Sequence, residues 1–305
     1  MADLFADRLA EAVLTKASPV VVGLDPDPAR LPTEVLKGPS SGDPRADTAQ
    51  AIRAFNEAVI EQIAPYACAV KPQIAYYEAC GVPGIQAFED TIQMAHDAGL
   101  LVISDIKRGD IGSTAKAYAA AHLLAPVSGD AITVNPYLGT DSIQPFLEAC
   151  HTTGSGLFAL VRTSNPSASE IQDLCVDGKP VHDHVAELVA RWGEGLRGSC
   201  GYSSVGAVVG ATAPAELAKL RALLPQTWFL IPGVGAQGGA AADVAPAFDS
   251  QGLGAVVNSS RGILYAFGDP STENWRSPIA NAARQLRDEL ADVRNKGPSL
   301  TTNRP

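Results

Sequence analysis

Cysteine, basic residues and long apolar runs are all scarce in this sequence, and each shortage excludes a class of protein. The five cysteines are far apart in 305 residues and form no Cys-X-X-Cys pair, which argues against a zinc site or a disulfide framework. We therefore expect reduced thiols in a cytoplasmic protein. No apolar run approaches the roughly 20 residues that cross a bilayer, and the first residues lack the basic region and apolar stretch of a secretory signal.

Acidic residues outnumber basic ones. The sequence has 23 Lys and Arg against 33 Asp and Glu, a formal net charge of −10, and no basic cluster. This balance argues against nucleic acid or an anionic membrane as the main partner. It is compatible with a phosphorylated small molecule, because one arginine and a few backbone amides can hold a phosphate. The hydrophobic fraction of 46% excludes wholesale disorder.

One pattern recurs along the chain: a short run rich in Val, Ile, Leu or Ala, then a loop marked by Gly, Pro or Ser, then an amphipathic stretch. Runs that are apolar on both faces and alternate with helices predict a parallel sheet covered by helices. Eight such units predict an α/β fold with a single (β/α)8 TIM barrel, and an open doubly wound sheet is the alternative. The expected strands are 19–25, 68–73, 100–107, 131–137, 156–164, 205–212, 228–235 and 254–262.

We expect the barrel domain to span residues 1–294, with an irregular insertion at 32–46 and a flexible C-terminal tail at 295–305. In such barrels the chemistry lies at the carboxyl ends of the strands, and phosphate sites favour the loops after strands seven and eight. Polar residues that end the apolar runs are therefore the candidates for a functional site.

The strongest local motif is Asp105-Ile106-Lys107-Arg108-Gly109-Asp110, at the end of the third run. Strand alternation puts Asp105 and Lys107 on one face, and Gly109 permits a turn that brings Asp110 back towards the ammonium group. Two carboxylates keep this lysine protonated, so Lys107 is expected to act as a proton donor or an electrostatic clamp. An ordinary salt bridge is the alternative, but three charges at a barrel mouth are costly unless a ligand needs them.

A second lysine, Lys71, ends the neighbouring run. Adjacent parallel strands lie about 4.8 Å apart, so Lys71 can reach Asp105, and Asp25 ends the strand beyond it. The sequence therefore predicts a row of alternating ammonium and carboxylate groups.

A glycine-rich segment, Gly233 to Gly239, follows the seventh run and matches G-X-G-X-X-G. A dinucleotide fold needs this motif near the first strand and an acidic residue at the end of the next strand, where this chain has Asn258. Backbone amides that approach a phosphate are the better interpretation, with Arg261 supplying a bidentate charge. Plain turn glycines are the alternative.

The triplet His182-Asp183-His184 invites a metal-site interpretation, but no third ligand is near in the sequence and Asp183 suits a helix N-cap. We therefore expect surface residues there and no metal site.

These residues resemble the orotidine 5′-phosphate decarboxylase family, in its longer bacterial subgroup. The resemblance covers roughly residues 5–290, and its segments occur in the expected order. The DIKRGDIGST segment also occurs in metal-dependent sugar-phosphate decarboxylases of the same suprafamily, whereas Lys71 and the TSN segment favour the pyrimidine branch. The matching segments are FADRL, VVGLDPDP, VKPQIAYYE, SDIKRGDIGST, TVNPYLGTDSIQPF, RTSNPSA, IPGVGAQGG and NSSRGI.

The resemblance implies a role for each candidate. Lys71, Asp105, Lys107 and Asp110 correspond to the family's charged tetrad. In a homodimer with shared active sites, Asp110, Ile111 and Thr114 would act in the neighbouring subunit's site. The implied substrate contacts are Asp25 at the ribose, Ser164 at the pyrimidine, Gly233, Ser260 and Arg261 at the phosphate, and Gln237 as the lid glutamine between phosphate and base.

The implied reaction is the decarboxylation of orotidine 5′-phosphate to uridine 5′-phosphate in pyrimidine biosynthesis, without cofactor or metal. Lys107 would protonate C6 of the ring as CO2 leaves. Three alternatives stay open: a Mg2+-dependent sugar-phosphate decarboxylase or epimerase, a Schiff-base aldolase that uses Lys71 or Lys107 as a neutral amine, and a barrel that binds a pyrimidine nucleotide without turnover.

Overall fold

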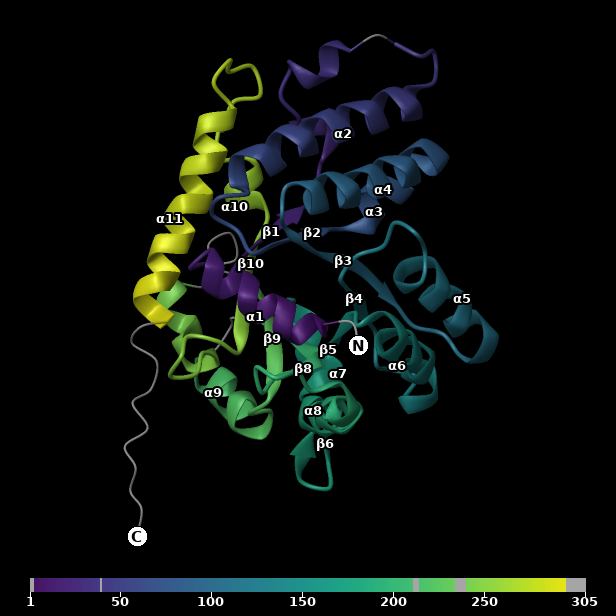
Figure 1. The fold of residues 1–305 in the computed structure, drawn as a ribbon, viewed down its shortest axis with the longest axis vertical. Helices are drawn as coiled ribbons and strands as arrows, with labels where there is room; N and C mark the ends of the chain where they lie inside the picture. Colours follow the sequence, from purple (N-terminus) through teal and green to yellow (C-terminus); the bar gives the residue numbers. More distant parts are fainter. Residues whose placement is uncertain (1–2, 39, 211–213, 234–239, 295–305) are drawn as a thin grey trace.

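The computed structural model describes residues 3–38, 40–210, 214–233 and 240–294. Eight parallel strands close into a barrel in the order β1-β10-β9-β8-β5-β4-β3-β2, which confirms the (β/α)8 fold and excludes the open sheet (Figure 1). Each strand falls within or next to one of the eight expected runs. The barrel strands are β1 (Val20–Leu24), β2 (Ala69–Pro72), β3 (Leu101–Arg108), β4 (Ala131–Val134), β5 (Gly156–Arg162), β8 (Ser203–Val209), β9 (Thr227–Pro232) and β10 (Ala255–Ser259).

Helices surround the barrel, and a small hairpin of β6 (Cys175–Val176) and β7 (Lys179–Pro180) projects from the loop after β5 (Figure 1). None of the described helices is both long and apolar enough to span a bilayer. The α-helices are α1 (Phe5–Thr15), α2 (Pro44–Ile63), α3 (Ile74–Glu78), α4 (Gly81–Asp97), α5 (Gly112–Leu123), α6 (Thr140–Thr153), α7 (Ser169–Gln172), α8 (Val181–Trp192), α9 (Pro214–Leu223), α10 (Arg261–Leu264) and α11 (Arg276–Arg294).

Strand alternation divides the core into two clusters. In β1, Val20 and Val22 face the outer helices, whereas Val21 faces the barrel interior and packs in the cluster that contains α1. Helix α1 closes the amino-terminal end of the barrel, where Phe5 packs edge-on against Phe158 with ring centroids 5.9 Å apart. Gly156 makes room for this, since a Cβ there would lie 2.3 Å from the Phe5 ring. This packing fills the amino-terminal end of the barrel, and in such barrels ligands bind at the carboxyl ends of the strands.

The expected insertion is more regular than predicted. Residues 35–37 form a 3-10 turn, and the region is tied to the start of α11, because Glu34 accepts hydrogen bonds from Trp275 and Arg276. These bonds lower the pKa of Glu34 to about 2. Helix α2 already begins at Pro44, inside the predicted insertion, because Asp43 caps it by accepting from the Arg45 N–H and proline suits the first helical position.

Candidate active site

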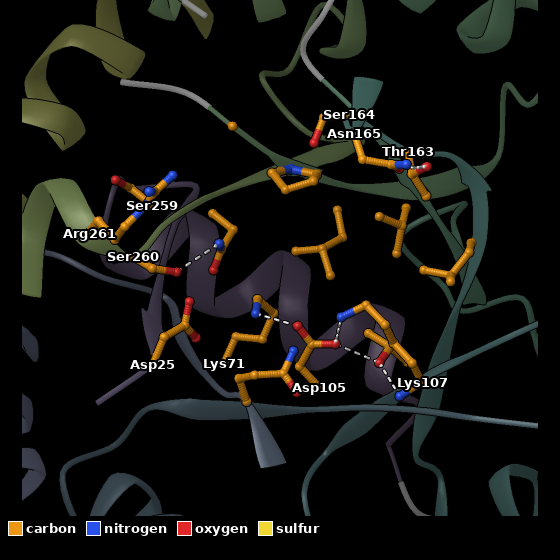
Figure 2. Close-up of a pocket in the computed structure, with 18 residues that line it drawn as sticks. Asp25, Lys71, Asp105, Lys107, Thr163, Ser164, Asn165, Ser259, Ser260 and Arg261 are labelled. Carbon is orange, nitrogen blue, oxygen red and sulfur yellow. Dashed lines mark hydrogen bonds and ion pairs between the residues drawn. The ribbon is translucent and has the colours of Figure 1, made fainter. Parts of the chain in front are cut away.

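A cavity of about 280 Å³ opens at the carboxyl ends of the strands (Figure 2). Sequence reasoning proposed twelve site residues, and most of them line this cavity. Gln237 and the rest of the glycine segment after Gly233 lie outside the described residues. The predicted residues that line the cavity are Asp25, Lys71, Asp105, Lys107, Ser164, Gly233, Ser260 and Arg261.

The charged side chains form a row along one side of the cavity, in the order Asp25, Lys71, Asp105, Lys107 (Figure 2). The Asp105 carboxylate lies between two ammonium groups: Lys71 Nζ is 2.6 Å from Oδ2, and Lys107 Nζ is 2.5 Å from Oδ1. Lys71 and Asp105 are buried, whereas the Lys107 side chain is 46% exposed and faces the opening. The predicted contact between Lys71 and Asp105 is therefore present, because β2 and β3 are adjacent.

This arrangement fixes the charge of the two buried groups. Burial by itself raises the pKa of Asp105, but the attraction and hydrogen bonds of Lys71 and Lys107 outweigh it and hold the pKa well below its usual range. Burial likewise lowers the pKa of Lys71, but the nearby Asp105 and Asp25 carboxylates leave that pKa above its usual value. Lys71 is therefore an ammonium ion at neutral pH and lacks the free amine that a Schiff base requires.

Asp110 does not return to Lys107 within one chain, so that part of the predicted motif geometry is wrong. Strand β3 runs on to Arg108, whose carbonyl accepts a hydrogen bond from the Asn135 N–H at 2.9 Å, and the loop then leads directly into α5. The Asp110 carboxylate instead accepts from the Ile111 N–H at 2.7 Å. Ile111 and Thr114 are exposed, and neither they nor Asp110 line the cavity.

The loops after β9, β10 and β1 supply the opposite end of the cavity. Gly233 takes a φ of 103°, which favours glycine, and Arg261 begins the short helix α10. Ser260 packs against Gly23, where a Cβ would lie 1.9 Å from the serine hydroxyl. Asp25 has a buried carboxylate oxygen with no hydrogen-bond partner among the described residues. A buried acceptor of this kind calls for a donor from a ligand or water.

Thr133 is a site residue that sequence reasoning missed. It is 1% exposed, lines the cavity from β4, and its hydroxyl donates a 2.8 Å hydrogen bond to Asp105 Oδ1. The same hydroxyl oxygen accepts a 2.9 Å bond from the Lys107 N–H. The signal in the sequence is a polar residue between the apolar Ile132 and Val134.

The segment after β5 carries Ser164, and Gln172 of α7 holds it in place. The Gln172 side-chain carbonyl accepts from the Thr163 N–H at 2.9 Å, and its amide donates to Thr163 Oγ1 at 2.7 Å. The Thr163 hydroxyl in turn donates to Asn165 Oδ1 at 2.6 Å. Thr163 and Asn165 line the cavity beside Ser164 but were not predicted.

The expectation that His182 and Asp183 lie on the surface is wrong. They are 4% and 6% exposed, because α8 packs with α7 and α9 over these positions. Asp183 lies in the first turn of α8, which begins at Val181, and is not the N-cap. The Oδ2 atom of Asp183 instead forms a 2.6 Å ion pair with Lys219 of α9.

Folding also brings together the additional ligand candidates that the sequence did not show. Asp173, His182 and Glu216 each have one potential ligand atom within 4.8 Å of the other two, close enough together to hold a metal ion. Arg162 already pairs with both carboxylates, at 3.2 Å from Asp173 and from Glu216. The cluster is therefore a network of ion pairs that fastens the loop after β5 to α8 and α9.

Comparisons with known proteins agree with this geometry. Curated proteins named orotidine 5′-phosphate decarboxylase from Rhodopirellula baltica and Deinococcus radiodurans are each 44% identical to the chain. The first aligns over 94% of this chain and 98% of its own length, and the second over 95% and 98%. The solved structure of Leishmania donovani OMP decarboxylase is 33% identical, with a TM-score of 0.75 over 95% of this chain and 98% of that one.

A family model supports the same assignment independently of any single relative. The model described as the orotidine 5′-phosphate decarboxylase / HUMPS family matches residues 18–274, a stretch that contains every barrel strand and every charged residue of the row. The chain therefore belongs to the orotidine 5′-phosphate decarboxylase / HUMPS family.

Proposed function

We propose that this protein converts orotidine 5′-phosphate to uridine 5′-phosphate and CO2 without a cofactor, as a cytoplasmic enzyme of pyrimidine nucleotide synthesis. The observation that carries the proposal is the Asp105 carboxylate between the Lys71 and Lys107 ammonium groups at the barrel mouth. The names of the curated relatives support this substrate. All five cysteines are free, which fits a reducing compartment.

The cavity has a suitable group for each part of the nucleotide. Arg261, with Ser260 and the backbone at Gly233, binds the phosphate at one end, and the unpartnered Asp25 oxygen accepts from a ribose hydroxyl. The segment that contains Ser164 lies across the cavity from the charge row (Figure 2). This position suits a contact with the pyrimidine. C6 of the ring and its carboxylate are then directed to Asp105 and Lys107.

The chemistry follows from the charges in the row. The bond between C6 and the carboxylate breaks, its electron pair stays on C6, and Lys107 Nζ delivers a proton there. Solvent can reprotonate Lys107, whose side chain is half exposed. The Lys107 cation stabilises the negative charge that develops on C6, and proton transfer completes the step. Asp105 repels the substrate carboxylate, and this repulsion ends when neutral CO2 leaves.

Turnover in the presence of a chelator tests the function directly. We expect the absorbance of the orotate ring to decrease with time when orotidine 5′-phosphate and EDTA are added together. No turnover of orotidine 5′-phosphate, together with Mg2+-dependent turnover of a sugar phosphate, would indicate a metal-dependent sugar-phosphate enzyme of the same family. Tight binding without turnover at saturating substrate would indicate a nucleotide-binding barrel.

We further propose a homodimer with shared active sites. Asp110, Ile111 and Thr114 do not line the cavity of their own chain, and this supports a role for them in the site of a second copy. Apolar side chains are exposed in the same region: Ile111 is 57% exposed, Tyr137 81% and Leu138 46%. Such a patch on the loops after β3 and β4 fits a surface that a second copy covers.

Subunit mixing tests this dimer. The Lys107→Ala and Asp110→Ala variants should each be inactive alone, because each lacks one residue that a shared site requires. A hybrid dimer has one site with both residues intact, so an equimolar mixture should regain about a quarter of wild-type activity after random exchange. The activity is measured after dissociation and reassociation of the subunits. A mixture that stays inactive would contradict a shared site.

Replacing Gln172 with alanine should weaken substrate binding more than turnover. The variant loses the hydrogen bonds that hold Thr163, and with them the position of Ser164. We expect KM for orotidine 5′-phosphate to rise about tenfold, equivalent to about 1.4 kcal/mol, with kcat changed by no more than about threefold. Gln93→Ala is the matched control, since that exposed amide donates to Asp97 on the surface of α4. Equal KM values in the two variants would refute the role of Gln172.

A further inference from the structure

Thr133 lies beside a bulge between β3 and β4, and its role in the reaction rests on the proposed function. In the β3–β4 ladder, Ser104 pairs with Ile132 and Arg108 pairs with Val134. Three residues of β3, from Asp105 to Lys107, therefore face a single residue of β4, which is Thr133. Bulges of this kind disrupt the ladder locally and redirect side chains, and they are frequent next to active sites.

The backbone within this bulge is strained. Lys107 has a φ of 44°, in the left-handed region that a lysine rarely adopts. Such a conformation is unfavourable and persists only where surrounding contacts hold it. The Lys107 N–H has left the regular ladder, and its hydrogen-bond partner is the Thr133 hydroxyl at 2.9 Å. A side chain thus takes the place of the backbone acceptor that the bulge removed.

The same hydroxyl orients the carboxylate. Thr133 donates to Asp105 Oδ1, the oxygen that also accepts from Lys107 Nζ, while Lys71 binds Oδ2. The buried Thr133 hydroxyl therefore links the Lys107 backbone to the Asp105 side chain. Because its single proton goes to Asp105, its lone pairs remain available to the Lys107 N–H, so both contacts are satisfied together.

We propose that Thr133 is a positioning residue of this enzyme, which holds the strained Lys107 backbone and the Asp105 carboxylate in the geometry that proton transfer to C6 requires. Thr133 contacts neither phosphate nor ribose in this arrangement, and its effect on the reaction passes through Lys107 and Asp105. A displacement of about 1 Å at reacting groups can cost about 100-fold in rate. The proposal therefore predicts a defect in kcat and little change in KM.

The test replaces Thr133 with valine, which has the same shape and lacks the hydroxyl. We expect kcat for orotidine 5′-phosphate to fall by about 10- to 100-fold, with KM and the affinity for uridine 5′-phosphate within about threefold of wild type. Thr133→Ser keeps the hydroxyl and should recover most of the lost kcat. Thr91→Val is the matched control: Thr91 is also fully buried and hydrogen-bonded, but it lies on α4 away from the cavity. This control should lose stability without losing kcat.

The outcomes separate this proposal from the proposed function. A wild type that does not turn over orotidine 5′-phosphate overturns both. A wild type that turns over, with a folded Thr133→Val variant whose kcat is near normal, overturns only the role of Thr133. If Thr133→Val does not fold, the Ser and Ala variants decide, because both lack the methyl group and differ only in the hydroxyl. Equal kcat values for Ser and Ala would refute the proposal.

Discussion

Lys107→Ala is expected to lower kcat for orotidine 5′-phosphate by at least about 10⁴-fold. The lysine combines two effects in one group, because its charge stabilises the carbanion and its proton ends the reaction. General-acid catalysis typically contributes about 10²–10⁴-fold, and one electrostatic contact about 10²–10³-fold. In the variant the proton has to come from a source other than Lys107, such as water. Single-turnover measurement of the loss of orotate absorbance gives the rate constant directly.

The fold and the affinity of this variant should stay close to wild type. The Lys107 side chain is 46% exposed, and Asp105 keeps its 2.6 Å contact with Lys71, so we expect a stability change of no more than about 1 kcal/mol. Binding of uridine 5′-phosphate, measured by calorimetry, should change by less than about tenfold. Lys179→Ala, which removes an exposed ion pair with Glu187 on α8, is the control with unchanged kcat. Turnover within about tenfold of wild type in Lys107→Ala would remove the proposed proton donor.

The parts of the site that the sequence predicted correctly depend on regular strand geometry. Alternating side-chain directions and the spacing of adjacent strands are nearly constant, so Lys71 and Asp105 at the ends of neighbouring runs had to meet. The position of Arg261 at the end of β10 follows from the same regularity. Eight apolar runs that alternate with helices similarly favoured the (β/α)8 barrel over an open sheet.

The parts that could not be predicted depend on irregular backbone and on contacts between distant segments. Asp110 was expected beside Lys107 because the β3–β4 bulge, which extends β3 to Arg108, has no sequence signature. The sequence marks Thr133 only as a polar residue among apolar ones, and its contacts depend on the bulge that places it alone opposite three residues. His182 is buried because α8 packs against α7 and α9, and this contact between distant segments cannot be predicted from the local sequence pattern.

Asp105→Asn is expected to impair both turnover and stability. The substitution removes the repulsion of the substrate carboxylate and the anion that orients Lys107, so kcat should fall at least about 100-fold. It also leaves the buried Lys71 ammonium without its main counter-charge. Removing one partner of a buried pair typically costs about 3–5 kcal/mol, and we expect a loss of this order at pH 7. Denaturant unfolding measures it, with the exposed Asp288→Asn as a near-neutral control.

The pH dependence of this stability loss identifies its electrostatic origin. The pKa of Asp105 is lowered in the folded state, so the folded protein binds fewer protons than the unfolded chain at acidic pH. The stabilisation from this carboxylate is complete above the ordinary aspartate pKa of about 3.9 and is lost as the pH falls below it, towards the folded-state pKa. The stability difference between wild type and Asp105→Asn should therefore be constant from pH 7 to 5 and shrink below about pH 4. Unfolding curves at pH 7, 5, 4 and 3 would reveal this trend, and a difference that stays the same at pH 3 would show that packing, and not the charge, accounts for the loss.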